Sequence, residues 1–378
     1  MKIVADNKIP FLKGVFEPFA EVVYLPGKET TAETVRDADA IITRTRTACN
    51  ESLLKGSSVK VIATATIGFD HIDTGWVEAA GIQWANAPGC NSWSVKQYIA
   101  STLCALAIKH GLKFEDLTLG VVGVGNVGSK VAAAGRALGM KVLLNDPPRA
   151  RKEGPDGFVS LDSIVSGCDI ITVHVPLTKE GEDSTLHLFD EARLAAMNPG
   201  QILINSSRGP VVDNCALKAA LAKGALKGAV LDVWEGEPDL DPGLVDMLDI
   251  TTPHIAGYSA DGKANGTTMS VRTVARTLGI KELEDWRSEG IPAPEQSLVF
   301  ELDARGKSRQ EVLTEAILHT YDVREDSERL RACLGQFEKL RGDYQIRREP
   351  SAFTIRLKGA DDATVRSLGI LDFNIDIQ

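Results

Sequence analysis

Three residues, Arg208, Glu237 and His254, carry side chains that could together oxidise a small hydroxy acid, and each follows an apolar run. A guanidinium can hold a carboxylate through paired, charge-assisted hydrogen bonds. An imidazole that titrates near neutrality can take the proton of a hydroxyl group, and a neighbouring carboxylate would orient it and stabilise its charged form. Taken singly, each residue could be a surface ion-pair, turn or loop residue. Because all three follow separate predicted strands, we predict that they form a catalytic set for hydride transfer to or from a 2-hydroxy or 2-oxo acid.

A glycine-rich turn with the pattern G-x-G-x-x-G lies upstream of these residues, after an apolar strand and before a helix. Asp146 ends the next predicted strand, which completes the arrangement of a dinucleotide site. An acid at this position binds the adenosine ribose and repels a 2′-phosphate, so NAD is favoured over NADP, although Arg149 and Arg151 could accommodate that phosphate. A glycine turn without a ligand is the alternative. The predicted cofactor-binding residues of this unit are Gly123, Gly125, Asn126, Val127, Gly128 and Asp146.

His174 ends a further predicted strand. Its position suggests contact with the cofactor, but the sequence offers it no acid partner. No catalytic role is assigned to it.

Short β-branched runs alternate with helical patterns through the first 90 residues or so. This alternation predicts a parallel sheet covered on both faces. The expected strands are 2–5, 21–25, 40–43, 59–65 and 82–85, and the expected helices are 31–38 and 71–80.

A second region repeats this architecture after a long helical pattern at about 94–110. It predicts a second doubly wound α/β domain, in which ligands bind beyond the carboxyl ends of the strands. The expected strands are 118–124, 141–145, 169–174, 201–205, 229–233 and 250–251, and the expected helices are 127–138, 190–197 and 213–223.

The composition changes after about Gly279. A charged segment at 281–297 with two prolines predicts a linker, and 298–378 mixes both patterns and predicts a small α+β domain for packing or oligomerisation. Its expected helices are 309–320 and 327–341, and its expected strands are 343–347 and 352–357.

The overall composition bounds the class of protein. The chain has 378 residues, 43% of them hydrophobic, and a net charge of −10 from 42 basic and 52 acidic residues. An acidic chain of this kind is a poor non-specific nucleic-acid binder. Charged residues interrupt the N-terminal apolar run, no apolar stretch is long enough to span a membrane, and the six cysteines are scattered without metal spacing. We expect a cytoplasmic protein with no metal, nucleic-acid or membrane partner.

The run Arg44-Thr45-Arg46-Thr47 follows a predicted strand and offers two cations and two hydroxyl groups, and Lys8 follows the first strand. Such a cluster could bind a phosphate. An ordinary charged loop is the alternative. The prediction is a substrate that carries a phosphate, with Arg44 and Arg46 binding it.

With these motifs in place, the chain resembles the D-isomer-specific 2-hydroxyacid dehydrogenase family over about residues 1–280. Three further stretches, 63–73, 86–91 and 145–150, and the extra C-terminal domain resemble a subgroup that acts on a phosphorylated 2-hydroxy acid with NAD. The family's Arg, Glu and His correspond to Arg208, Glu237 and His254. The resemblance implies substrate contacts from Thr45, Thr66 and Tyr258. It also implies cofactor contacts from Asp146, Val175, Ser206, Ser207, Arg208, Asp232 and Gly257.

The resemblance also implies a domain plan and an assembly. The family has two α/β domains with the active site between them, a flavodoxin-like substrate domain and a Rossmann NAD domain. The boundaries that it implies are 1–93 with 257–280 for the substrate domain, 94–256 for the NAD domain, 281–297 for the linker and 298–378 for a domain that forms a homodimer. One departure is Gln97, which stands where an acid is usual and is expected to alter hydrogen bonding between domains.

Two alternatives remain open at this point. One is a dehydrogenase of another phosphorylated 2-hydroxy acid, such as 3-phosphoglycerate. The other is a protein that senses NAD(H) on the same scaffold without catalysis, which the intact set of Arg208, Glu237 and His254 disfavours.

Overall fold

The structure is a computed structural model that describes all 378 residues, and the chain forms two compact units. The first unit comprises Met1–Asn91 and Ser259–Pro292, and the second comprises Ser92–Tyr258 and Ala293–Gln378. The first unit is therefore discontinuous in sequence. None of the helices combines the length and the apolar character needed to cross a bilayer.

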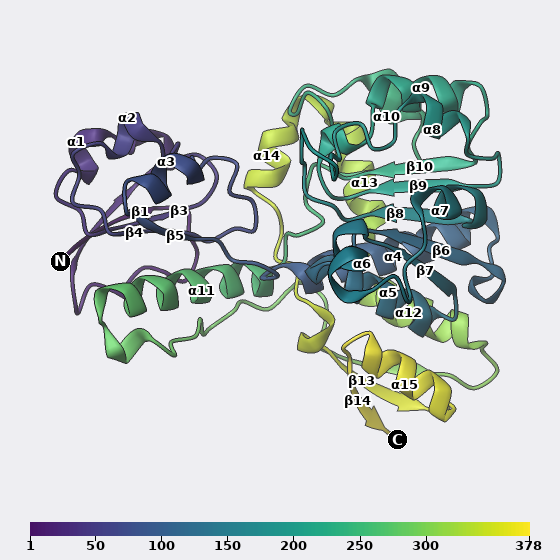
Figure 1. Cartoon of the computed structure of the whole chain (residues 1–378). Helices are drawn as coiled ribbons and strands as arrows, with labels where there is room; N and C mark the ends of the chain where they lie inside the picture. Colours follow the sequence, from purple (N-terminus) through teal and green to yellow (C-terminus); the bar gives the residue numbers. More distant parts are fainter. The chain divides into compact units, whose positions relative to one another are not determined.

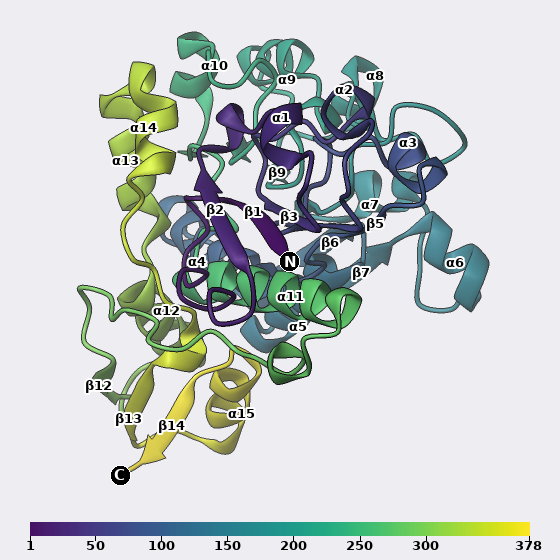
Figure 2. The same cartoon turned by 90° about the vertical axis from the view of Figure 1, so that its left-hand side faces the viewer.

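The first unit contains a parallel five-stranded sheet in the order β2-β1-β3-β4-β5. Side chains of α11 bury one face, and those of α1, α2 and α3 bury the other (Figure 1 and Figure 2). The order reverses at β1, so the loops after β1 and β3 leave the same edge of the sheet side by side. The strands are β1 (Lys2–Asp6), β2 (Glu21–Leu25), β3 (Ala40–Thr43), β4 (Val61–Thr64) and β5 (Gln83–Ala85), and the helices are α1 (Ala32–Val35), α2 (Glu51–Leu54), α3 (Thr74–Ala79) and α11 (Ala260–Leu278).

The second unit contains a parallel six-stranded sheet in the order β11-β10-β9-β8-β6-β7. Helices α4 and α5 pack on one face, and α7, α8, α9 and α10 pack on the other (Figure 1). The strands are β6 (Thr118–Val122), β7 (Lys141–Asn145), β8 (Ile170–Val173), β9 (Ile202–Asn205), β10 (Gly228–Leu231) and β11 (Ile250–Thr251), and the helices are α4 (Ser92–His110), α5 (Asn126–Leu138), α6 (Pro147–Glu153), α7 (Leu161–Gly167), α8 (Glu191–Ala195), α9 (Asn214–Ala222) and α10 (Pro242–Met247).

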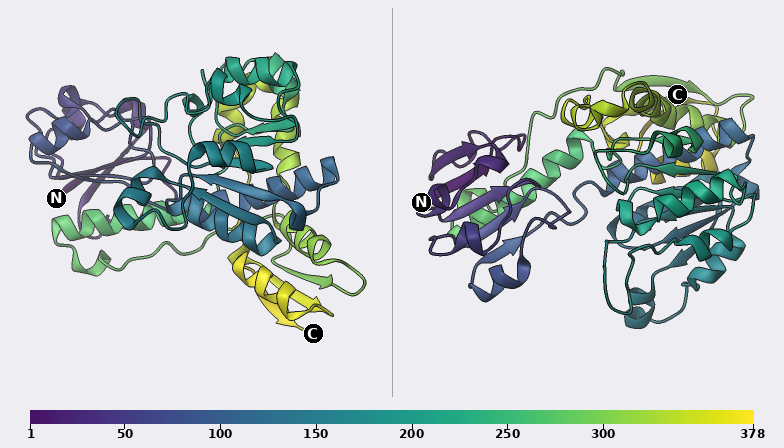
Figure 3. Two further views of the ribbon diagram at one scale, coloured as in Figure 1. Left: turned by 45° about the vertical axis from the view of Figure 1, so that its right-hand side comes forward. Right: turned by 90° about the horizontal axis from the view of Figure 1, so that it is seen from above.

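Residues 293–378, the C-terminal module, add a three-stranded parallel sheet in the order β12-β13-β14 (Figure 3). Apolar side chains of α12 and α13 share one core with α4 and α5, so the module packs as part of the second unit. Its elements are β12 (Val299–Asp303), α12 (Arg309–Thr320), α13 (Val323–Ala332), α14 (Phe337–Gly342), β13 (Thr354–Lys358), α15 (Asp362–Ile370) and β14 (Asn374–Ile377).

The predicted fold class, two doubly wound parallel-sheet domains with a small additional domain, is confirmed. Two expectations for the C-terminal module are wrong. The helix expected at 327–341 is broken between α13 and α14, where Cys333 leaves the helical conformation. The strand expected at 343–347 does not form. Ile346 is 44% exposed there while Arg347 is 3% exposed, so the sequence pattern reflects an inward-pointing arginine and not the apolar face of a strand.

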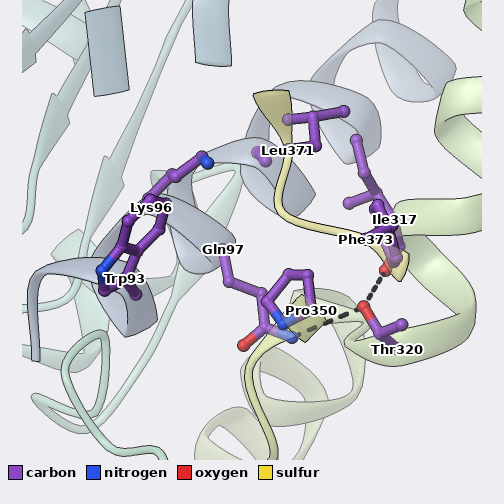
Figure 4. A pocket seen from close by; sticks show the side chains of 9 residues that line it. Trp93, Lys96, Gln97, Ile317, Thr320, Pro350, Leu371 and Phe373 are labelled. Carbon is purple, nitrogen blue, oxygen red and sulfur yellow. Dashed lines mark hydrogen bonds between the residues drawn. The ribbon is translucent and has the colours of Figure 1, made fainter. Parts of the chain in front are cut away.

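Helix α4 and the C-terminal module meet around Gln97, the residue that departs from the family pattern. Its side-chain amide donates to the carbonyl oxygen of Arg348 at 3.0 Å. It also donates to Thr320 Oγ1 at 3.4 Å (Figure 4). Lys96 and Trp93 line the same pocket, together with Pro350. Within the second unit, Gln97 thus connects α4 to the C-terminal module.

Candidate active site

The second unit places three of the predicted residues beyond the carboxyl ends of adjacent strands. Arg208 follows β9, Glu237 follows β10, and His254 follows β11. His254 Nδ1 lies 2.9 Å from Glu237 Oε2, and the two side chains are partly buried, at 32% and 21% exposed. The imidazole is therefore held at one nitrogen by a carboxylate while its other nitrogen, Nε2, remains available to a ligand.

A buried carboxylate, that of Asp232, holds the backbone of the segment that carries His254. Asp232, 1% exposed, accepts hydrogen bonds from the N–H groups of Ile255 at 2.7 Å and Ala256 at 3.0 Å. These bonds hold His254 at a φ of 57°, a left-handed conformation that non-glycine residues rarely adopt. Burial raises the pKa of Asp232 despite the opposing charge of His254 and these hydrogen bonds. Asp232, predicted as a cofactor contact, is therefore seen here as a support of the His254 segment.

Glu237 keeps its charge in spite of its partial burial. Burial raises its pKa, but the hydrogen bond from His254, the charge of His254, the N–H of Trp234 at 2.9 Å and the charge of Arg341 together outweigh it, and the net pKa is lowered. An ionised carboxylate beside an imidazole stabilises the protonated form of that imidazole. The pair is suited to accept and return a proton.

Arg208 lies on a turn that is fixed by its neighbours. Asn205, fully buried, accepts hydrogen bonds from the backbone and hydroxyl of Ser207 and donates to the carbonyl oxygen of Arg208 at 2.9 Å. A side chain on Gly209 would meet the carbonyl oxygen of Trp234 at 2.0 Å, so this turn lies directly against the segment that leads to Glu237. The structure thus brings the Arg208 turn and the Glu237 segment together.

The glycine turn after β6 has the shape that a dinucleotide requires. A Cβ on Gly128 would lie 1.9 Å from the carbonyl oxygen of Gly123, and Gly123 itself has a φ of +85°. By contrast, a Cβ on Gly125 would meet nothing within 4 Å. Helix α5 begins immediately afterwards without a side-chain cap, which leaves its first N–H groups free for a phosphate. The residues present therefore fit a dinucleotide.

Asp146 stands at the end of β7 beside this turn. Its carboxylate accepts hydrogen bonds from the N–H of Val124 at 2.8 Å and of Arg149 at 3.0 Å, where it caps α6. Arg149 donates to the carbonyl oxygen of Val124 at 2.6 Å and pairs with Glu153. Arg151 pairs with Glu182 and Asp183. Both arginines that could have favoured NADP thus already have acidic partners.

Two buried polar atoms just beyond the carboxyl ends of β8 and β9 have no hydrogen-bond partner, His174 Nδ1 and Ser206 Oγ. Burial lowers the pKa of His174 to about 3, so its ring is neutral, and its Nε2 lies 2.9 Å from Thr172 Oγ1. Val175 lies against Gly123. Unpaired buried polar groups of this kind call for a ligand or water.

The first unit holds four of the five residues that were predicted to contact the substrate, and Tyr258 belongs to the second unit. Arg44 begins the loop after β3 and donates to the carbonyl oxygen of Lys8, at the point where the strand order reverses. Thr64 Oγ1 donates to the carbonyl oxygen of Arg44 at 2.9 Å and lies 2.8 Å from Thr66 Oγ1. Thr45 and Arg46 are exposed on the same loop. This edge of the sheet thus carries three cations, Lys8, Arg44 and Arg46, and the hydroxyl groups of Thr45, Thr64 and Thr66.

Sequence reasoning missed two arginines of the C-terminal module near the His254 segment. Arg347, 3% exposed, donates to the carbonyl oxygen of Ala256 at 2.6 Å. Arg341 donates to Tyr258 Oη at 3.2 Å. The contacts join residues more than 80 positions apart, so no local pattern could have found them. The structure contains no group of three or more His, Cys, Asp or Glu side chains arranged to hold a metal.

Comparison with known proteins agrees with this geometry. Residues 97–256 match the family described as D-isomer specific 2-hydroxyacid dehydrogenase, NAD binding domain, and residues 295–369 match a domain of unknown function. An erythronate-4-phosphate dehydrogenase of Bacteroides fragilis is 52% identical over 94% of this chain and 99% of its own. The enzyme of the same name from Klebsiella pneumoniae is 43% identical over 98% of both chains.

Among solved structures, a D-lactate dehydrogenase of Aquifex aeolicus in complex with NAD and lactic acid is similar to this chain. It is 28% identical, with a TM-score of 0.60, over 78% of this chain and 100% of its own.

Proposed function

Because the chain belongs to the erythronate-4-phosphate dehydrogenases, within the D-isomer-specific 2-hydroxyacid dehydrogenase family, we propose that it oxidises 4-phospho-D-erythronate with NAD. The product is 2-oxo-3-hydroxy-4-phosphobutanoate, on the route to pyridoxal 5′-phosphate, vitamin B6. The observation that carries this proposal is the pair of His254 and Glu237 in a domain of the dinucleotide-binding type, in a chain 43–52% identical to enzymes of that name.

The proposed catalytic roles follow from the chemistry of the side chains. Arg208 holds the substrate carboxylate and the oxygen at C2 through charge-assisted hydrogen bonds. His254, with Nδ1 donating to Glu237, takes the C2 hydroxyl proton at Nε2. Glu237 orients the ring and stabilises the imidazolium that results. In the reverse direction the same imidazolium returns the proton to the 2-oxo group.

The cofactor accepts the hydride that leaves C2, and this chain supplies its site and its orientation. The turn Gly123–Gly128 and the N-terminus of α5 would hold the pyrophosphate. Asp146 would bind the adenosine ribose, which favours NAD. The remaining proposed contacts are Val175, Ser206, Ser207, Arg208, Asp232 and Gly257.

The substrate phosphate is proposed to bind to the first unit, at the edge where β1 and β3 end. Arg44 and Arg46 supply charge, and Thr45 and Thr66 supply hydroxyl groups. We propose that the first unit is the substrate domain and that residues 94–256 are the NAD domain, with Tyr258 also contacting the substrate.

The assembly and the compartment are also proposals. Residues 298–378 of the C-terminal module are proposed to form a homodimer, and the enzyme is proposed to work in the cytoplasm. Light scattering would report a mass of twice 40.6 kDa for a dimer. A mass of one chain at micromolar concentration would contradict it.

The direct test of the function is a substrate panel followed by NADH absorbance. The panel contains 4-phospho-D-erythronate, D-erythronate and 3-phosphoglycerate. We expect the highest kcat/KM on 4-phospho-D-erythronate, and His254→Ala should abolish that turnover while NAD binding persists. A preference for 3-phosphoglycerate would replace the proposed substrate, and near-normal turnover of the variant would refute the role of His254.

A further inference from the structure

The C-terminal module carries a cation beside the proposed catalytic residues that the roles above do not use. Arg341, on α14, is 20% exposed and donates to Tyr258 Oη at 3.2 Å. The guanidinium also lies 5.7 Å from the centre of the Tyr258 ring and 5.8 Å from that of Phe337. Its charge contributes to the lowered pKa of Glu237. Arg341 therefore lies in the electrostatic surroundings of the proton-transfer pair.

The hydrogen-bonding capacity of this guanidinium is largely unused. An arginine has five N–H donors in a planar fork. Arg341 uses one of them on Tyr258, its Nε is buried without a partner, and the nearest carboxylate, Glu338, lies 3.9 Å from Nη1. That separation is too long for a hydrogen bond. Because its ion pair with Glu338 is long and leaves donors unused, the guanidinium can bind a further anion.

The proposed substrate supplies such an anion. Its carboxylate, beside C2, is assigned to Arg208, and its phosphate lies two carbons and an ester oxygen beyond C2 on the other side. A phosphate carries nearly two charges and accepts bidentate hydrogen bonds from arginine. Arg341 also lies within 295–369, outside the NAD-binding domain. Relatives named for a phosphorylated acid match nearly the whole chain, whereas the D-lactate dehydrogenase matches a smaller share of it.

We propose that Arg341 binds the phosphate of the substrate as a further cation besides Arg44 and Arg46, so that the C-terminal module contributes to specificity for a phosphorylated acid. This inference rests on the proposed function. Tyr258 accepts a hydrogen bond from the guanidinium, and the ring of Phe337, 2% exposed, lies close to it. The proposal gives the C-terminal module a role in substrate recognition in addition to any role in assembly.

The test compares Arg341→Ala, Arg341→Lys and the control Lys339→Ala in the full-length enzyme. Lys339 is exposed on the same helix, so its removal changes the charge of α14 equally. Arg341→Ala should raise KM for 4-phospho-D-erythronate about 10- to 100-fold, the effect of losing one or two charge-assisted hydrogen bonds. KM for NAD should stay unchanged, and kcat/KM for D-erythronate should fall far less than kcat/KM for 4-phospho-D-erythronate. Arg341→Lys should recover part of the loss, and Lys339→Ala should match the wild type.

Other outcomes overturn the proposal. Equal losses on both acids, with kcat falling and the pH profile displaced, would make Arg341 a positioning residue of Glu237. An unchanged KM would remove the role altogether. Titration calorimetry of 4-phospho-D-erythronate into the NAD-loaded enzyme separates this proposal from the proposed function. If the wild type binds the compound without turning it over, only the function fails, and weaker binding by Arg341→Ala still supports the phosphate site. If Arg341→Ala binds equally well, or if the wild type does not bind, the phosphate site is refuted.

Discussion

At the scale of single residues, the proposed chemistry depends on a carboxylate that stays ionised beside an imidazole. Glu237 has a lowered pKa, so it is charged at neutral pH. Its interaction with His254 stabilises the folded site, and this contribution is lost only as the pH falls through the lowered pKa of Glu237. A neutral amide at this position keeps the shape and removes the charge. A substitution of Glu237 by Gln therefore tests the role of the charge without leaving a cavity at this position.

We predict that Glu237→Gln lowers kcat about 10²- to 10⁴-fold. Because the imidazolium loses its stabilising charge, the ascending limb of kcat/KM should also move to lower pH. The matched control is Glu235→Gln. Glu235 precedes Glu237 by two residues and also pairs with a histidine, since its carboxylate lies 2.7 Å from His187 Nε2. An unchanged pH profile in Glu237→Gln would contradict the coupling, as would an equal loss in the control.

A second prediction concerns the two arginines after β3. Replacing Arg44 or Arg46 by Ala should raise KM for 4-phospho-D-erythronate about tenfold or more and leave KM for D-erythronate unchanged. Lys55→Ala is the control, because Lys55 is an exposed cation of the same unit. Steady-state kinetics on the two acids measure the difference. Equal effects on both acids would remove the phosphate role of this loop.

The candidate site was only partly predictable at this scale. Arg208, Glu237 and His254 stand out because each follows an apolar strand, which is a local signal. The two bonds from Asp232 that hold His254, and the bond of Arg347 to Ala256, join residues separated by 23, 24 and 91 positions. Nothing local in the sequence encodes such contacts. They depend on which loops the fold brings together.

At the scale of elements, the turn between β6 and α5 combines two different demands on glycine. Gly128 is required by packing, because a side chain there would collide with the carbonyl oxygen of Gly123. Gly125 has an extended backbone that any residue can adopt and open space at its Cβ. The space at Gly125 is therefore available to a ligand.

The two glycines should respond differently to alanine. Gly125→Ala should change the free energy of unfolding by less than about 1 kcal/mol and raise the Kd for NAD about tenfold or more. Gly128→Ala should lower the free energy of unfolding by about 1–3 kcal/mol or more, because the backbone must move. Chemical denaturation and NAD titration measure both quantities. Unimpaired NAD binding by Gly125→Ala would contradict the proposed path of the pyrophosphate.

The boundaries of helices and strands were predictable from the sequence where burial of apolar side chains determines the element. Strands such as Ala40–Thr43 and Lys141–Asn145 are short, mainly apolar runs between turn residues, and both match the expected ranges. The strand prediction for residues 343–347, after α14, was wrong because the inward-facing residues of this segment are polar. Tyr344 and Tyr321 donate to Asp326 at 2.6 and 2.8 Å, and Arg347 lies over the Tyr321 ring. A buried polar cluster of this kind has no apolar period to detect.

At the scale of the whole molecule, the proposal divides recognition between two units that each have their own sheet and core. The cofactor residues belong to the second unit, and the phosphate loop Arg44–Thr47 belongs to the first. A ligand stabilises the part of a protein to which it binds, in proportion to its concentration over Kd. The two ligands should therefore protect different parts of the chain.

Hydrogen exchange tests this division. NAD alone should slow amide exchange in Gly123–Gly128 and in the turn at 206–208, and leave 44–47 unchanged. Adding 4-phospho-D-erythronate to the NAD-loaded His254→Ala variant, which binds without turnover, should then slow exchange at 44–47. Local opening limits exchange in such exposed loops, so protection there reports direct ordering by the ligand and not global stability. If NAD alone protects 44–47 to the same extent, the first unit responds to the cofactor, and its assignment as the substrate domain is wrong. If neither ligand protects that loop, the phosphate role proposed for Arg44 and Arg46 is wrong, and only the role proposed for Arg341 is left.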